Sequence, residues 1–264
     1  MPSIFAYQSS EIDWCESNFQ YSQVVAEFYN TFSNVTFLLL GPLMMYLMHP
    51  YAQKRSRSIY GISALFMLVG LFSMYFHSTL SFLGQLLDEL AILWLLGCCY
   101  SIWMPRCYFP AFLGGSRLQF SCLVFITTVV STFLSFLRPT VNAYALNSIA
   151  LHILYIVVQE YKKSTNKELR HLVQVSVVLW VLALASWLSD RLLCGFWQRI
   201  HFFYLHSIWH VLISFTFPYG MVILSLVDAS YEMPGETFKI RYWPRDTWPV
   251  GLPYVEVQCD TKKC

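Results

Sequence analysis

Three histidines from two distant stretches of the chain have the type and spacing of a metal site. His206 and His210 are four residues apart, so on a helix they lie on one face and can bind one metal ion together. His77 can supply a third imidazole from another helix. Three histidines that leave a fourth coordination position open are a ligand set of catalytic zinc. The pattern therefore predicts a catalytic zinc site.

Two further polar residues accompany these histidines in otherwise apolar segments. Ser73 precedes His77 by four residues and shares its helical face, and Asp88 opens the next apolar segment. Beside a zinc ion, a carboxylate can act as a general base and acid, and a hydroxyl can donate to a developing oxyanion. Glu89 points about 100° away from Asp88 on a helix and is the weaker candidate. The other histidines lack such neighbours and are interpreted as structural: His49, His152, His171 and His201.

These residues belong to a chain whose composition is that of a membrane protein. Of its 264 residues 56% are hydrophobic and 12% are charged, whereas soluble domains carry about 25% charged residues. A net charge of +2 gives no indication of nucleic-acid binding. A membrane span needs about 20 largely apolar residues. Seven segments qualify: 32–49, 60–83, 86–104, 119–137, 142–160, 172–190 and 204–227.

We therefore expect an all-α fold, a polytopic seven-transmembrane helix bundle. The expected division is an acidic N-terminal segment at 1–31, a catalytic bundle at 32–227 and a polar C-terminal tail at 228–264. Fourteen lysines and arginines lie on one side of the membrane in this arrangement. The other side has three, which are Arg138, Arg191 and Arg199. Because basic loops stay in the cytosol, the N-terminus is predicted to be lumenal and the C-terminus cytosolic.

This topology places the polar residues of the spans at one depth. His77 lies six residues before the predicted end of its span at Leu83, about 9 Å along a helix. Asp88, His206 and His210 lie near the first turns of spans that start on the same lumenal side. A lone histidine in a span is more often a packing residue than a ligand. Matching depth favours a shared site over scattered structural histidines.

At these residues the sequence resembles the alkaline ceramidase family, within a wider group of seven-span hydrolases that includes adiponectin receptors. The resemblance covers nearly the whole chain, from the acidic run that begins at Asp13 to the tail. The set of Ser-x-x-x-His, Asp and His-x-x-x-His is characteristic of the wider group. The acidic N-terminal segment is more specific to ceramidases.

The resemblance implies a zinc-dependent amidohydrolase that cleaves ceramide to sphingosine and a free fatty acid. Zinc would be held by His77, His206 and His210, Asp88 would hydrogen-bond the attacking water, and Ser73 would lie beside the scissile carbonyl. The implied location is the membrane of the endoplasmic reticulum, or of the Golgi. Nothing in the sequence indicates an obligate protein partner.

The family also has a lumenal calcium site that activates the enzyme and a disulfide near it. The resemblance implies that Cys15 pairs with Cys194; both lie on the predicted lumenal side, where a disulfide is permitted, and the alternative is two free thiols. Carboxylate oxygens suit calcium, and positions 1–31 contain no basic residue, but an ordinary solvated acidic segment would look similar. The implied calcium ligands are Asp13, Trp14 through its backbone carbonyl, Glu16, Asn18 and Glu27.

Two other classes of protein remain as alternatives. The first is a receptor of the adiponectin-receptor branch that keeps a zinc site, which we expect to have a long cytosolic N-terminal domain and the opposite orientation. The second is a zinc transporter, which we expect to carry acidic and histidine sites along a permeation path. The short acidic N-terminal segment favours the ceramidase.

Overall fold

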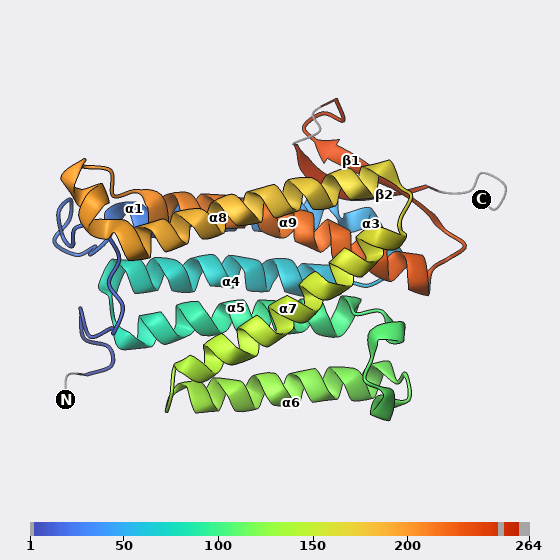
Figure 1. Cartoon of the computed structure of the whole chain (residues 1–264), viewed down its shortest axis with the longest axis horizontal. Coiled ribbons are helices and arrows are strands. Elements are labelled where there is room, and N and C mark those ends of the chain that lie inside the picture. Colours follow the sequence, from blue (N-terminus) through green and yellow to red (C-terminus); the bar gives the residue numbers. More distant parts are fainter. Residues whose placement is uncertain (1–2, 248–250, 259–264) are drawn as a thin grey trace.

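The computed structural model describes residues 3–247 and 251–258. Lys262 and Lys263, which contribute to the predicted charge bias, lie outside the described residues. The described chain is mainly helical and its long helices lie side by side, with α7 crossing obliquely (Figure 1). The helices are α1 (Phe28–Ser33), α2 (Val35–Leu47), α3 (His49–Lys54), α4 (Ser58–Thr79), α5 (Phe82–Trp103), α6 (Arg117–Ser135), α7 (Thr140–Lys163), α8 (Lys167–Arg199) and α9 (Leu205–Glu232), with short 3-10 turns at Arg106–Tyr108 and Ala111–Leu113.

Six of these helices, α4 to α9, are long and apolar enough to cross a membrane, which confirms the all-α polytopic class. The count of seven is not confirmed. The first predicted span, 32–49, is helical but divided, because the helix is interrupted at Asn34 and again at Met48. Its longest piece, α2, has 13 residues, about 20 Å of helix, which is shorter than the hydrocarbon core of about 30 Å.

The spans divide into an inner and an outer group. In α4, α5 and α9, 44%, 50% and 56% of the most apolar stretch is buried within the protein, against 17%, 11% and 17% in α6, α7 and α8. The inner helices therefore supply the side chains that pack the core. The outer helices turn most of their apolar surface to the surroundings, as lipid-facing helices do.

The N-terminal segment closes the end of the bundle where α4 stops. Helix α4 ends at Thr79 and is followed by Leu80, a residue in the left-handed conformation with φ of 48°. The last carbonyls of a helix lack intrahelical partners. Here the carbonyls of His77 and Ser78 accept from the backbone N–H groups of Glu27 and Ala26. This pairing fixes Glu27 directly beside His77.

Helix α8 is longer than the predicted span 172–190 and is kinked at Leu193, where the backbone leaves helical geometry. Cys194 follows the kink and forms a disulfide with Cys15, the pairing that the resemblance implies. The two Cα atoms are 5.3 Å apart, within the usual range for a disulfide. The N-terminal segment is thereby joined to the same end of α8.

A β-hairpin in the C-terminal tail is a feature that the sequence analysis did not anticipate. Strands β1 (Thr237–Trp243) and β2 (Leu252–Gln258) pair antiparallel. Ile240, Leu252 and Val255 join the main hydrophobic core, so the hairpin covers the end of the bundle opposite the N-terminal segment (Figure 1). Isolated hairpins are marginally stable, and this one depends on burial against the helices.

Candidate metal centre

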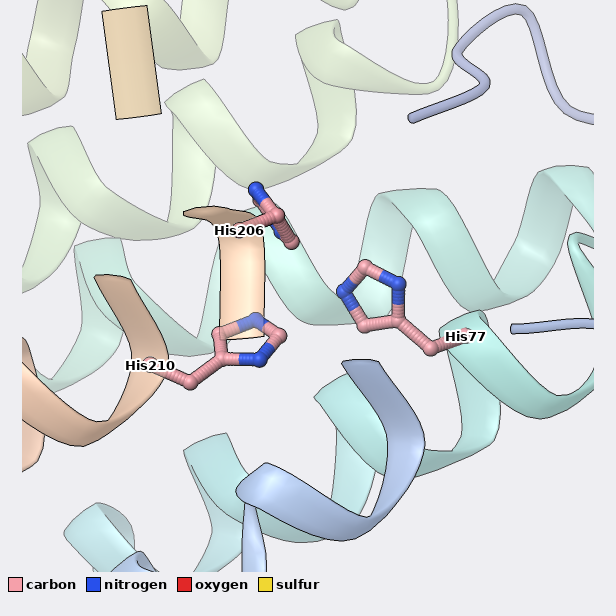
Figure 2. A group of neighbouring side chains, drawn as sticks. All are labelled: His77, His206 and His210. Atoms are coloured by element: carbon pink, nitrogen blue, oxygen red, sulfur yellow. The ribbon is translucent and has the colours of Figure 1, made fainter. Parts of the chain in front are cut away.

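His77, His206 and His210 converge in the interior of the bundle. Figure 2 shows the His77 imidazole from α4 facing the two imidazoles from α9. One potential ligand atom from each side chain lies within 4.8 Å of the others, and all three residues are buried. The ring centroids are 4.6 to 5.0 Å apart. The i, i+4 pair and the third histidine therefore form the constellation that their spacing predicts.

The hydrogen bonds of His77 leave one nitrogen available to a metal. Its Nδ1 is bonded to a carboxylate oxygen of Glu27, whereas its Nε2 is buried with no partner among the described residues. With Glu27 ionised, Nδ1–H donates and the lone pair lies on Nε2. A carboxylate that orients a histidine in this way is typical of zinc sites. A buried nitrogen without a partner is costly, and a metal ion would satisfy it.

His210 has the same arrangement with a different partner. Its Nδ1 lies 2.8 Å from Ser33 Oγ at the end of α1. Asn34 Nδ2 lies 3.3 Å from the same nitrogen, and it donates to the carbonyl of Asn30 at 2.8 Å. Because Ser33 Oγ also donates to that carbonyl, it can accept from a protonated His210 Nδ1. The lone pair is then on Nε2, the nitrogen that faces Ser73 Oγ at 3.5 Å. Sequence analysis did not identify Ser33 as part of the site, since a serine in a polar segment carries no distinctive signal.

His206 is held by ring stacking. The indole of Trp14 stacks on its imidazole with the ring centroids 3.7 Å apart and the planes at 22°. The Nδ1 atom of His206 is buried and has no hydrogen-bond partner within the described residues. Trp14, expected to contribute only a carbonyl to a calcium site, therefore also contacts the histidine cluster through its side chain.

Ser73 and Asp88 lie at the same place. Ser73 is buried on α4, one helical turn before His77, and its hydroxyl interacts with the Asp88 carboxylate of α5. Asp88 is half-buried. The structure thus brings the Ser73 hydroxyl beside the His210 imidazole and the Asp88 carboxylate beside that hydroxyl. Glu89 instead accepts from Gln85 Nε2 at 3.1 Å, away from the histidines, as its helical angle predicts.

The acidic residues of the N-terminal segment gather beside this cluster. Glu27 interacts with Asp13 and with Glu16. Asp13 accepts from the side-chain amide of Asn18, while the amide oxygen of Asn18 is buried without a partner among the described residues. None of these three carboxylates forms an ion pair with a described lysine or arginine. Uncompensated carboxylates and an unused amide oxygen fit a hard cation such as calcium.

Burial of the Glu16 and Glu27 carboxylates is unfavourable without a cation. Desolvation raises the pKa of Glu27 to about 8 and the pKa of Glu16 to about 7. Glu16 also accepts from the backbone N–H groups of Tyr29 and Asn30 at 2.7 and 2.8 Å, so it caps the start of α1. That use of Glu16 was not expected from the sequence. Of the five implied calcium ligands, Glu27 is the one that also accepts from a histidine of the cluster.

Comparison of the sequence with known proteins shows the family to which the chain belongs. A family model described as Ceramidase matches residues 6–256. The chain belongs to the ceramidase family. It is 81% identical over 264 residues to alkaline ceramidase 1 of Homo sapiens, with both chains covered completely. It is 73% identical to alkaline ceramidase 1 of Mus musculus, covering 100% of this chain and 97% of the relative. It is 36% identical to alkaline ceramidase of Drosophila melanogaster, covering 95% and 88%.

Membership of the ceramidase family confirms the resemblance and makes the chain an enzyme of the hydrolase class. It also gives the buried cluster a context, because a family named for ceramide cleavage needs a site that can activate water inside a lipid-facing bundle. Among the described residues, the three imidazoles are a group that could hold a metal ion.

Proposed function

We propose that the chain is an intramembrane zinc-dependent ceramidase, activated by calcium, that cleaves ceramide into a sphingoid base and a free fatty acid. The observation that carries the proposal is the buried cluster of His77, His206 and His210, beside Ser73 and Asp88, in a chain of the ceramidase family. The apolar bundle suits the acyl chain of a ceramide. The receptor and transporter alternatives have no comparable support.

The donor set of this cluster fits zinc. His77 and His210 each have Nδ1 bonded to a neighbouring oxygen and Nε2 directed into the cluster, which is the arrangement of zinc-binding histidines. Three neutral imidazoles leave a fourth position open, as in catalytic zinc sites. A zinc ion held there would lower the pKa of a water molecule to about 7 and polarise the amide carbonyl.

The remaining steps are assigned to side chains of the chain itself. Asp88 takes a proton from the attacking water and then delivers one to the departing nitrogen, because an amine leaves more easily than its anion. Ser73 Oγ, 3.5 Å from His210 Nε2, donates a hydrogen bond to the carbonyl oxygen as negative charge develops on it.

We assign calcium to the acidic cluster of the N-terminal segment, with Asp13, Trp14, Glu16, Asn18 and Glu27 as its ligands. Glu27 connects the two sites, because the carboxylate that would bind calcium also orients His77. Occupancy of the calcium site would hold Glu27 ionised and keep the His77 lone pair on Nε2. Calcium would then raise activity by ordering a zinc ligand.

The distribution of basic residues supports a lumenal active site and a cytosolic C-terminus, and we place the enzyme in the endoplasmic reticulum or Golgi membrane. The Cys15–Cys194 disulfide agrees with an oxidising lumen. Residues 1–31, 32–227 and 228–264 would then be the lumenal calcium-binding segment, the catalytic bundle and the cytosolic tail. Attachment of a glycosylation acceptor to either terminus would test this orientation.

The central experiment measures metal content and product release on purified protein. We expect about one zinc per chain and release of fatty acid from a panel of ceramides. His210→Ala should lose both zinc and hydrolysis while the protein still inserts in the membrane. His49→Ala is the matched control, because His49 lies on α3 outside the cluster and bonds Tyr60. A metal-free His210→Ala enzyme with wild-type turnover would refute the zinc mechanism.

A further inference from the structure

Asp190 is a buried acidic residue that the proposed reaction does not use. It lies on α8, three residues before the kink at Leu193, and is only 1% exposed. It ends the predicted span 172–190, and an ionisable residue in a span is a functional candidate by default. The sequence analysis did not single it out, because no partner at i, i+4 accompanies it.

The contacts of Asp190 lead to two parts of the metal centre. One carboxylate oxygen, Oδ2, accepts from the backbone N–H of Cys15 at 3.1 Å. The backbone N–H of His206 lies close enough to interact electrostatically with this carboxylate, and the second oxygen, Oδ1, is buried with no hydrogen-bond partner in the described chain. Asp190 thus hydrogen-bonds the residue that follows Trp14 and lies beside the backbone N–H of a histidine in the cluster.

The start of α9 needs such a group. Its N-cap residue, Tyr204, makes no side-chain capping bond, and the first α-helical bond is donated by Ile208 to the Tyr204 carbonyl. The N–H groups of the first turn therefore lack intrahelical partners. A carboxylate at this end is favoured by the helix dipole. Asp190, from another helix, supplies the negative charge that no residue in the first turn of α9 provides.

The same carboxylate fixes the stacked pair of rings. Trp14 stacks on His206, and the backbones on both sides of this stack converge on Asp190. Gln198 Nε2 also holds this segment by donating to the carbonyl of Cys15 at 3.3 Å, but no contact joins Gln198 to His206 in the described structure. Of these two side chains, only Asp190 connects the N-terminal segment to the backbone of the histidine.

We propose that Asp190 is a positioning residue for His206: it caps α9 from α8 and holds Trp14 against the imidazole, so that His206 is oriented before a metal binds. The proposal rests on the proposed zinc function for its consequence in catalysis, but the local order of the start of α9 is independent of that function. Asp190 acts through the backbone and does not contact substrate.

The test compares Asp190→Asn with Gln198→Ala in the full-length protein, purified in the same detergent and with the disulfide intact. Asparagine keeps the size of Asp190, but it offers one acceptor oxygen, and its NH2 group would oppose one of the two backbone N–H donors. Gln198→Ala removes a tie to the same Cys15 and leaves the α9 contact unchanged. Asp190→Glu retains the charge and tests rescue.

Two measurements are made on each variant: hydrogen exchange of the amides at 205–207 in metal-free protein, and zinc affinity by competition with a chelator. For Asp190→Asn we expect faster exchange at these amides and a loss of zinc affinity of about tenfold. Gln198→Ala should match wild type in both measurements, and Asp190→Glu should recover most of the zinc affinity.

Unchanged exchange at 205–207 in a folded Asp190→Asn protein would overturn the proposal, and so would equal effects of Asp190→Asn and Gln198→Ala. Should Asp190→Asn fail to fold, Asp190→Glu decides. It supports the proposal if its zinc affinity stays near wild type. It overturns the proposal if its loss of zinc affinity exceeds that of Gln198→Ala while exchange at 205–207 is no faster than in that control. A wild-type protein that binds no zinc would refute the proposed function, while the exchange measurement would still decide the role of Asp190.

Discussion

Glu27→Gln is the most informative single substitution, because Glu27 lies between the two proposed metal sites. Its side chain is fully buried and receives three donors. Oε1 accepts from the Trp14 backbone N–H at 3.1 Å, and Oε2 accepts from Asn30 Nδ2 at 3.0 Å and from His77 Nδ1. Glutamine is nearly the same size but has one acceptor oxygen and an NH2 group. In either amide orientation its NH2 group faces at least one donor.

The expected effect on zinc follows from this geometry. If the amide oxygen of the introduced glutamine kept the contacts of Oε2, its NH2 group would oppose the Trp14 N–H; in the other orientation it would oppose His77. Loss of a partner that orients a zinc ligand typically reduces metal affinity or activity by about 10–100-fold, or about 1.4–2.7 kcal/mol. We expect a decrease in this range for zinc affinity and for kcat, together with loss of calcium activation.

The assay titrates zinc against a competing chelator in calcium-free buffer and then measures kcat and KM for ceramide with and without calcium. Glu16→Gln is the matched control, since Glu16 is also an implied calcium ligand but its oxygens bind the N–H groups of Tyr29 and Asn30 and not His77. It should weaken calcium binding and leave zinc affinity in calcium-free buffer unchanged. Wild-type zinc affinity in Glu27→Gln would refute the reasoning that Glu27 orients His77.

Three further predictions concern proton transfer, pH and the disulfide. Asp88→Asn should lower kcat by about 10²–10⁴-fold with zinc content unchanged, and a proportional loss of zinc would show instead that Asp88 is a ligand. Burial raises the pKa of Glu27 to about 8 and of Glu16 to about 7, so both carboxyls hold protons below those values. Calcium affinity measured by titration should therefore rise with pH through this range, by up to about tenfold per pH unit for each proton displaced. A calcium affinity that does not change with pH would contradict this prediction. Cys15→Ser should lower the midpoint of thermal unfolding. Cys15 and Cys194 are 179 residues apart, and the loss of unfolded-chain entropy on closing a loop of that length can stabilise the folded state by up to about 5 kcal/mol. An unchanged midpoint in oxidising buffer would show that the disulfide is not stabilising.

The helical framework could be read from the sequence because its signals are local. Each long apolar segment is close to the length of about 20 residues needed to span a membrane, and α4 to α9 coincide with six of the seven predicted spans. The i, i+4 spacing of His206 and His210 depends only on the period of a helix. Depth could be compared between spans because the distribution of basic residues predicts their direction. These properties are set within a few turns of chain, so they require no knowledge of the packing.

Other features depend on contacts between residues far apart in sequence, and only the tertiary structure decided them. Glu27 reaches His77 across 50 residues, and Ser33 reaches His210 across 177. The first predicted span is divided where α1 turns Ser33 toward α9, although its composition is that of a continuous helix. The C-terminal hairpin exists because its apolar face packs against the bundle. Hydropathy and helical period determine which segments become helices and which faces can meet. A metal-binding histidine is oriented by a partner that the packing of other elements places beside it. The residues near that histidine in the sequence do not indicate which partner this is.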